Sequence, residues 1–225
     1  MHKIQLNPEL VERSRGHRGR VLAFHRIDPS KTAHLIIDMQ NGFVEPGGAV
    51  EIPLARDIVP NINKVSAEVR RAGGVNVFLR FTYDETEATP WTVWYNVIAS
   101  PESKRASAEA FWEGAHGHQL WSKLDVQDDD LIVNKTRFSG FTPGTSELDR
   151  ILKERGIETV IISGTMSNCC SESTARDAQQ MNYQVVFLAD ANATLTDEEH
   201  NATLNNVQTL FGDVIMADDV SGLWA

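Results

Sequence analysis

Short apolar runs alternate along this chain with longer segments whose apolar residues recur at helical spacing. The runs are rich in β-branched residues, as in strands buried on both faces of a parallel sheet. The alternation predicts an α/β fold with a doubly wound, Rossmann-like, mostly parallel sheet and helices on both faces. Predicted strands cover 33–38, 75–81, 130–134, 158–163, 184–188 and 213–217. Predicted helices cover 55–72, 144–155, 170–181 and 197–211.

Residues 1–30 lie outside this alternation, and residues 31–225 form one predicted domain. The first segment carries four arginines between positions 13 and 20 against two glutamates. We interpret it as a basic N-terminal arm. It is expected either to pack on a neighbouring subunit or to form a partly ordered leader.

Three predicted strand ends carry side chains that could work together. Asp38 ends the first run, Lys135 follows the third, and Cys170 lies where the fourth turns into a helix. The carboxyl ends of parallel strands share one edge of the sheet, so these side chains could converge there. A helix N-terminus and a nearby ammonium would lower the pKa of the thiol, and a carboxylate could take its proton.

Each of these residues also has a purely structural interpretation. A cysteine at a strand-to-helix turn is more often part of the core than a nucleophile. Asp38 could cap a turn, and Lys135 could be a solvated residue at a strand end. The conjunction of all three is what favours catalysis.

Four segments make the chain resemble the isochorismatase-like cysteine hydrolases. That superfamily includes nicotinamidase, N-carbamoylsarcosine amidohydrolase, ureidoacrylate amidohydrolase and isochorismatase. The resemblance spans nearly all the chain, implies a six-stranded sheet, and assigns residues 31–225 to an isochorismatase-like hydrolase domain. It is closest to the ureidoacrylate and N-carbamoylsarcosine branch. The segments are 35–43, 134–141, 164–174 and 188–191.

The resemblance implies a catalytic triad of Asp38, Lys135 and Cys170. In the family the nucleophile lies six residues after the glycine that ends the strand, here Gly164, which selects Cys170 over its neighbour Cys169. The family commonly has a valine where this chain has Cys169 or Ser171, the residues on either side of the nucleophile. A cysteine or serine at these positions keeps the side chain small and leaves the triad intact.

The same resemblance implies backbone and pocket features. The family places a cis peptide after the strand glycine, here the bond from Thr165 to Met166. The backbone N–H groups of Met166 and Cys170 would then form the oxyanion hole. Phe43 and Cys169 occupy positions that line the substrate pocket in relatives.

The long connection between the second and third predicted strands is rich in aromatic residues. Such connections often form pocket walls. We predict Tyr83 and Trp94 as substrate contacts, and expect Phe111 and Trp112 to pack in a satellite core or a subunit interface. Arg137, two residues after the lysine, either meets a substrate carboxylate or pairs with a surface acid.

No metal and no organic cofactor are predicted. Nicotinamidases of this superfamily carry an Asp-x-His and a further His, whereas residues 80–85 contain no histidine. Nicotinamide hydrolysis is therefore disfavoured. The pair His116 and His118 lacks a third ligand nearby, which makes it a weak zinc signal.

Composition limits the partners. The chain has 225 residues, is 41% hydrophobic and carries a net charge of −10, which suits one domain with a sizeable core and argues against nucleic acid as a partner. No apolar run is long enough to span a membrane, and the two adjacent cysteines are no secreted disulfide framework. We expect a cytoplasmic homo-oligomer, dimer or tetramer, whose partner is a small-molecule substrate.

The function predicted from these features is a cysteine-dependent amidohydrolase. It would cleave a C–N bond in a small linear amide, ureide or carbamoyl compound through a thioester acyl-enzyme. One alternative is isochorismatase-type enol-ether hydrolysis, which does not require the cysteine. Another is a catalytically silent small-molecule-binding member of the fold. An aspartyl phosphatase is disfavoured because Gln40 stands where its second aspartate belongs.

Overall fold

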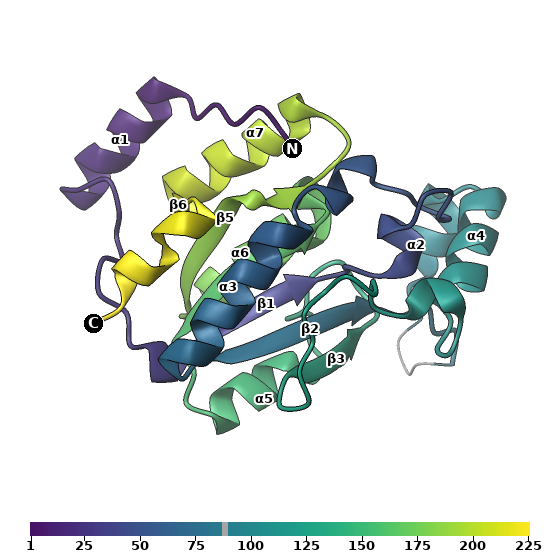
Figure 1. The fold of residues 1–225 in the computed structure, drawn as a ribbon. Coiled ribbons are helices and arrows are strands. Elements are labelled where there is room, and N and C mark those ends of the chain that lie inside the picture. The colour runs from purple at the N-terminus through teal and green to yellow at the C-terminus, as the bar shows by residue number, and fades with distance from the viewer. Residues whose placement is uncertain (87–89) are drawn as a thin grey trace.

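Six strands form one sheet at the centre of the protein (Figure 1). The computed structural model describes residues 1–86 and 90–225. The strands are β1 (Thr32–Ile37), β2 (Val75–Phe81), β3 (Leu131–Lys135), β4 (Thr159–Thr165), β5 (Gln184–Ala193) and β6 (Asp213–Ile215). Their order is β3-β2-β1-β4-β5-β6, and every neighbouring pair runs parallel. The predicted doubly wound α/β fold is confirmed.

Helices cover both faces of the sheet (Figure 1). They are α1 (Pro8–Arg18), α2 (Asn41–Val44), α3 (Val59–Ala72), α4 (Pro101–Phe111), α5 (Leu148–Glu154), α6 (Glu172–Gln180) and α7 (Asp197–Asn206). Helix α3 packs on one face together with the C-terminal turn Ala217–Leu223, while α5, α6 and α7 pack on the other. No helix in the described part of the chain is long and apolar enough to span a membrane.

Alternate side chains of the central strands serve two cores. In β1, Ile36 faces the core under α3, whereas Leu35 and Ile37 face the core under α5, α6 and α7. All three side chains are fully buried. This explains why the strands are apolar throughout, since each residue of a doubly covered sheet meets one core or the other.

Some element boundaries differ from the sequence-based expectation. The helix expected over 197–211 changes at Val207 into a π-helical turn that ends at Phe211. Helix α4 was not predicted, although it begins with Ser100 as N-cap and Pro101 in the first turn, which are standard start signals. Its apolar residues are sparse, so the apolar periodicity gave no signal.

The strand order creates a crevice at one edge of the sheet. The chain leaves β1 through α3 on one face, and it leaves β4 through α6 on the other. Adjacent strands whose connections depart to opposite faces leave a ligand-binding crevice beyond their carboxyl ends. Asp38 follows β1, Lys135 ends β3, and Cys170 lies in the turn after β4.

The N-terminal segment packs on its own chain instead of reaching away from it. In α1 the Ser14 hydroxyl donates to the Gln208 carbonyl at 2.9 Å. Arg18 forms a 2.8 Å ion pair with Asp213, whose side chain is buried. The segment is thus attached to its own chain through an arginine that satisfies a buried carboxylate, and its packing on a neighbouring subunit stays a prediction.

Strands β1 and β4 approach most closely at Gly164. Its φ is +118°, and a Cβ added there would lie 2.1 Å from the carbonyl oxygen of Ile37, its register partner. Only glycine fits such a backbone contact. The contact fixes how the Asp38 turn and the nucleophile turn face each other.

We predict that Gly164→Ala destabilises the protein more than an alanine at a glycine with similar φ but open surroundings. Gly73, at the end of α3, has a φ of +91° and no atom within 4 Å of its added Cβ. Gly73→Ala should cost about 1–2 kcal/mol from backbone strain alone. Gly164→Ala adds a clash and should cost at least about 2 kcal/mol more. Urea unfolding of both variants tests this, and equal losses would contradict it.

Candidate active site

The three side chains predicted from strand ends meet at the carboxyl edge of the sheet. Lys135 Nζ lies 2.7 Å from Asp38 Oδ2, and both side chains are fully buried. The ammonium also donates to the Arg137 carbonyl at 3.0 Å. The structure thus places Lys135 and Asp38 in one ion pair, although they lie 97 residues apart.

The turn after β1 sets the position of the Asp38 carboxylate. Asp38 has a φ of +52°, a left-handed conformation that aspartate tolerates better than most residues. Its backbone N–H donates to the Leu79 carbonyl at 3.0 Å, which holds the turn against β2. The buried Gln40 amide donates to the Phe81 carbonyl at 3.0 Å and accepts from the Phe81 N–H at 2.7 Å. Residue 40 thus fixes the turn rather than supplying a second acid.

Cys170 lies in a π-helical turn, Ser167–Ser171, that joins β4 to α6. The carbonyl of Met166 accepts from the N–H groups of Cys169 and Ser171, both at 3.1 Å. The bond from Thr165 to Met166 is cis, as the family resemblance implied. The Cys170 side chain lies at the bottom of the crevice, with the residue 6% exposed.

A buried histidine supports this turn from behind. The Ser167 hydroxyl lies 2.8 Å from Nδ1 of His200, whose Nε2 lies 3.0 Å from the Ala189 carbonyl. Burial lowers the pKa of His200 to about 4, so the ring is neutral and donates through Nε2. The ring of His2 stacks on it, with centroids 4.3 Å apart. The N-terminal segment therefore helps to hold the nucleophile turn.

Burial and the ion pair together decide the protonation of Asp38 and Lys135. Burial raises the pKa of the Asp38 carboxyl, and the nearby Lys135 charge and Cys170 thiol oppose this in part. Burial alone would lower the pKa of Lys135, but the attraction of Asp38 and the cysteine sulfurs raises it overall. A carboxylate with a raised pKa is a stronger base than an exposed one.

The Cys170 thiol is protonated in the resting protein, which corrects the sequence-based expectation of a lowered pKa. Contact with the Cys169 side chain and burial raise the pKa of Cys170 well above its usual range, and Asp38 acts in the same direction. Lys135 opposes these effects. Burial and the neighbouring carboxylate, which the expectation left out, outweigh the effect of the helix N-terminus on the pKa of this thiol.

The second oxygen of Asp38 is placed to accept the thiol proton. Asp38 Oδ1 is buried and has no hydrogen-bond partner within the described residues. The Cys170 thiol approaches the carboxyl closely enough to lower its pKa. A free acceptor beside a protonated thiol is an arrangement for general-base activation of a nucleophile.

An aromatic cavity of about 290 Å³ opens beside the thiol. Of the predicted substrate contacts, Phe43, Trp94 and Cys169 line this cavity. We expected Phe111 to pack in a satellite core or a subunit interface. It is buried and stacks on Phe43 with centroids 4.5 Å apart, and it also lines the cavity. The described residues that line it are Phe43, Val50, Phe81, Trp94, Ser107, Phe111, Phe138, Met166, Cys169 and Cys170.

Two predicted substrate contacts lie outside this lining. The Tyr83 hydroxyl donates to Glu85, and its ring packs on Tyr95. The Arg137 guanidinium lies 5.2 Å from the Trp91 ring centroid and donates to Thr136. Their contact with a substrate stays a prediction, since neither side chain is among the described residues that line the cavity beside Cys170. Residues 87–89 of the connection after β2 lie outside the described part.

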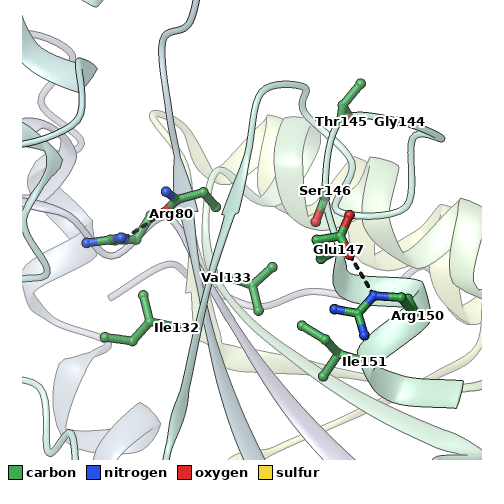
Figure 2. A pocket seen from close by; sticks show the side chains of 10 residues that line it. Arg80, Ile132, Val133, Gly144, Thr145, Ser146, Glu147, Arg150 and Ile151 are labelled. Carbon is green, nitrogen blue, oxygen red and sulfur yellow. Dashed lines mark hydrogen bonds and ion pairs between the residues drawn. The ribbon is translucent and has the colours of Figure 1, made fainter. Parts of the chain in front are cut away.

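A larger cavity of about 490 Å³ follows the edge strand β3 (Figure 2). Figure 2 shows Arg80 on one side of it and the Glu147–Arg150 ion pair on the other. None of the triad residues contributes to its lining. Despite its size, it is not where the candidate nucleophile lies.

The two histidines considered as metal ligands have separate partners. His116 Nε2 lies 2.7 Å from Glu45, while the buried His118 Nε2 lies 2.8 Å from the Thr82 hydroxyl. Within residues 1–86 and 90–225, no three His, Cys, Asp or Glu side chains are grouped as a metal ion needs. Metal binding therefore finds no support in these side chains.

Sequence reasoning missed several residues that line the aromatic cavity. Phe138 was available as a signal, because it belongs to the motif after Lys135 and lies 5.0 Å from Trp94, centroid to centroid. Ser107 gave no signal in the sequence, because its position at the cavity depends on helix α4, which was not predicted.

Trp112, expected in a satellite core or a subunit interface, lies at the end of that helix and is 47% exposed.

Comparisons with known proteins agree with this geometry. A family model described as Isochorismatase domain matches residues 32–219. The ureidoacrylate amidohydrolase RutB of Pseudomonas syringae pv. syringae is 31% identical over 207 residues, covering 86% of this chain and 84% of the relative. Its namesake from Variovorax paradoxus is 34% identical over 211 residues, covering 88% and 82%. A solved cysteine hydrolase from Pseudomonas syringae pv. phaseolicola is 28% identical, with a TM-score of 0.78, covering 89% and 96%. The resemblance read from the motifs is confirmed.

We predict that alkylation of Cys170 reports the charge of Lys135. With Cys169→Ala as background, only Cys170 can react with iodoacetamide. The change removes the contact with Cys169, but burial and Asp38 still raise the pKa of Cys170, so the alkylation rate should still be rising at about pH 9. Lys135→Met removes a positive charge that favours the thiolate, so it should move the profile up by about one pH unit or more. Lys153→Met, a change to an exposed lysine of α5, is the control and should not shift it. A plateau below neutral pH in the background protein would contradict a protonated resting thiol.

Proposed function

The chain belongs to the isochorismatase family, and from that premise we propose that it is a cysteine-dependent amidohydrolase acting on non-peptide C–N bonds. Its substrate is a small linear amide, ureide or carbamoyl compound. The observation that carries this proposal is the buried Lys135–Asp38 ion pair beside the Cys170 thiol at the base of a cavity. The names of its relatives supply the reaction class.

The first half-reaction forms a thioester. Asp38 takes the proton from the Cys170 thiol as the sulfur attacks the substrate carbonyl carbon, which gives a tetrahedral oxyanion. The backbone N–H groups of Met166 and Cys170 stabilise that oxyanion, and both residues line the cavity. Asp38 then passes the proton to the leaving nitrogen, the C–N bond breaks, and ammonia or an amine departs.

The second half-reaction hydrolyses the thioester. Asp38 accepts a proton from a water molecule as the water oxygen attacks the acyl carbon. The C–S bond breaks, the thiol of Cys170 regains its proton, and the acid product leaves. The raised pKa of Asp38 suits both steps, since the same group must accept and return a proton near neutral pH.

Lys135 acts through Asp38 rather than on the substrate. Its ammonium is fully buried and is held by the carboxylate of Asp38 and the carbonyl of Arg137. It orients the base and favours the ionised form of both Asp38 and the attacking sulfur.

Both cysteines are free thiols, which supports a location in the reducing cytoplasm.

We predict that ammonia release from small amides, ureides and carbamoyl acids depends on Cys170. Cys170→Ala should lower kcat/KM by at least about 1,000-fold, as loss of a nucleophile does. The adjacent change Cys169→Ala should keep the acyl adduct and lose less than about tenfold in kcat/KM, because it alters the cavity wall and a contact of the thiol but leaves all three triad side chains in place. Ammonia assays and intact-mass spectrometry of the quenched enzyme measure both.

Two outcomes would point elsewhere. Hydrolysis of an enol ether by both the wild type and Cys170→Ala, without ammonia release from any amide, would indicate activity of the isochorismatase type, which does not use the thiol. Absence of turnover, of acyl adduct and of Cys170 alkylation in a folded protein would indicate a silent binding member of the family.

A further inference from the structure

We propose that the aromatic cavity selects uncharged amides with a compact apolar acyl group and discriminates against amides that carry a carboxylate. This inference rests on the proposed amidohydrolase function and narrows its substrate class. It is drawn from the chemistry of the cavity wall beside Cys170.

Hydrocarbon dominates the wall. Three aromatic rings of the wall contact one another. Phe43 and Phe111 stack, and Phe81 meets Phe111 edge-on at 5.5 Å between centroids. Trp94 and Phe138 close the other side. Among the ten described residues that line it, the polar side-chain groups are the two cysteine thiols, the Ser107 hydroxyl and the indole N–H of Trp94.

The wall carries no positive charge among the described residues. Lys135 is the nearest candidate, but it is fully buried and its ammonium is bound to Asp38. Arg137 packs over the ring of Trp91, which in turn meets Phe138 edge-on, and it is not among the described lining residues. The segment 87–89 reads Glu-Ala-Thr and contains no cationic side chain.

Size restricts the acyl group further. A cavity of roughly 150 Å³ can hold a benzene molecule, so about 290 Å³ suits one ring or a short branched chain together with its carboxamide. Larger acyl groups would either extend past the exposed Val50 at the rim or press on buried aromatic side chains. Phe111 is 1% exposed and cannot move without opening the core.

A carboxylate would be poorly accommodated in such a wall. Transfer of an ionised group from water to an apolar site without a counter-ion costs several kcal/mol, whereas an isopropyl group gains from the same transfer. Ureidoacrylate, which the names of two relatives contain, carries a carboxylate. The substrate preference of this chain should therefore differ from the one those names state.

Matched substrate pairs test the inference on the intact protein. In 3-methylbutanamide and 4-methylpentanamide an isopropyl group occupies the place that a carboxylate takes in malonamate and succinamate. We expect kcat/KM for ammonia release to favour the isopropyl member of each pair on the order of 100-fold. Calorimetric titration of the same four compounds into Cys170→Ala measures binding without turnover and should show the same order.

A charge placed in the wall should change the selectivity. Ser107 lies on α4 and belongs to the lining of the cavity. Ser107→Arg should raise the carboxylate-to-isopropyl ratio of kcat/KM at least about tenfold. Ser103→Arg adds the same charge to an exposed position of the same helix and should leave the ratio unchanged. Val50→Arg, at the cavity rim, replaces Ser107→Arg if that variant melts early.

The outcomes separate the inference from the function. Carboxylate members favoured in Cys170-dependent turnover would overturn the inference and leave the amidohydrolase standing. Isopropyl members favoured in binding, with no turnover of any compound, would support the cavity chemistry and overturn the proposed reaction. A ratio that shifts equally in Ser107→Arg and Ser103→Arg would overturn the assignment of this wall as the selective surface.

Discussion

The buried ion pair between Lys135 and Asp38 is the interaction on which the site depends. Two charges without solvent exposure are tolerated only when each has a partner at close range, and removing one partner costs about 3–5 kcal/mol. Strand β2 lies between the strands that lead to these residues, so the pair can form only when the sheet is in register. The pairing that makes catalysis possible therefore also requires the correct fold.

The same pair explains why the thiol can rest protonated and still react. Burial raises the pKa of the Asp38 carboxyl, and Lys135, 2.7 Å away, opposes this rise and favours the ionised form. Cys170 keeps its proton because burial and the carboxylate both disfavour a second anion. When the sulfur attacks, the carbonyl oxygen of the substrate takes up the negative charge. Transfer of the thiol proton to Asp38 is therefore favourable only when substrate is present. The nucleophile is thus protected until it is needed.

The sequence predicted the features that depend on strand patterning and missed those that depend on loop packing. Asp38 and Lys135 follow apolar runs, so sheet topology alone brings them to one edge. Ser107 was missed because its place depends on a connection without apolar periodicity. The same connection leaves Tyr83 outside the described lining of the aromatic cavity. The pKa of Cys170 was wrong in sign, since the neighbours that raise it lie on other strands or become close only in the turn.

The charges of Lys135 and Asp38 balance each other, so the residues of the cavity wall can differ between proteins without affecting the triad. The ammonium of Lys135 is fully engaged by Asp38 and a backbone carbonyl, so it offers no charge to a substrate. Any selectivity for a charged substrate must then come from wall residues, and here these are aromatic and aliphatic except for Ser107 and the cysteines. Chemistry and selectivity therefore reside in different elements: strand ends hold the reacting groups, and α4 with its neighbouring connection shapes the wall. Changes in that connection can alter the substrate while the buried ion pair, and with it the reaction, stays intact.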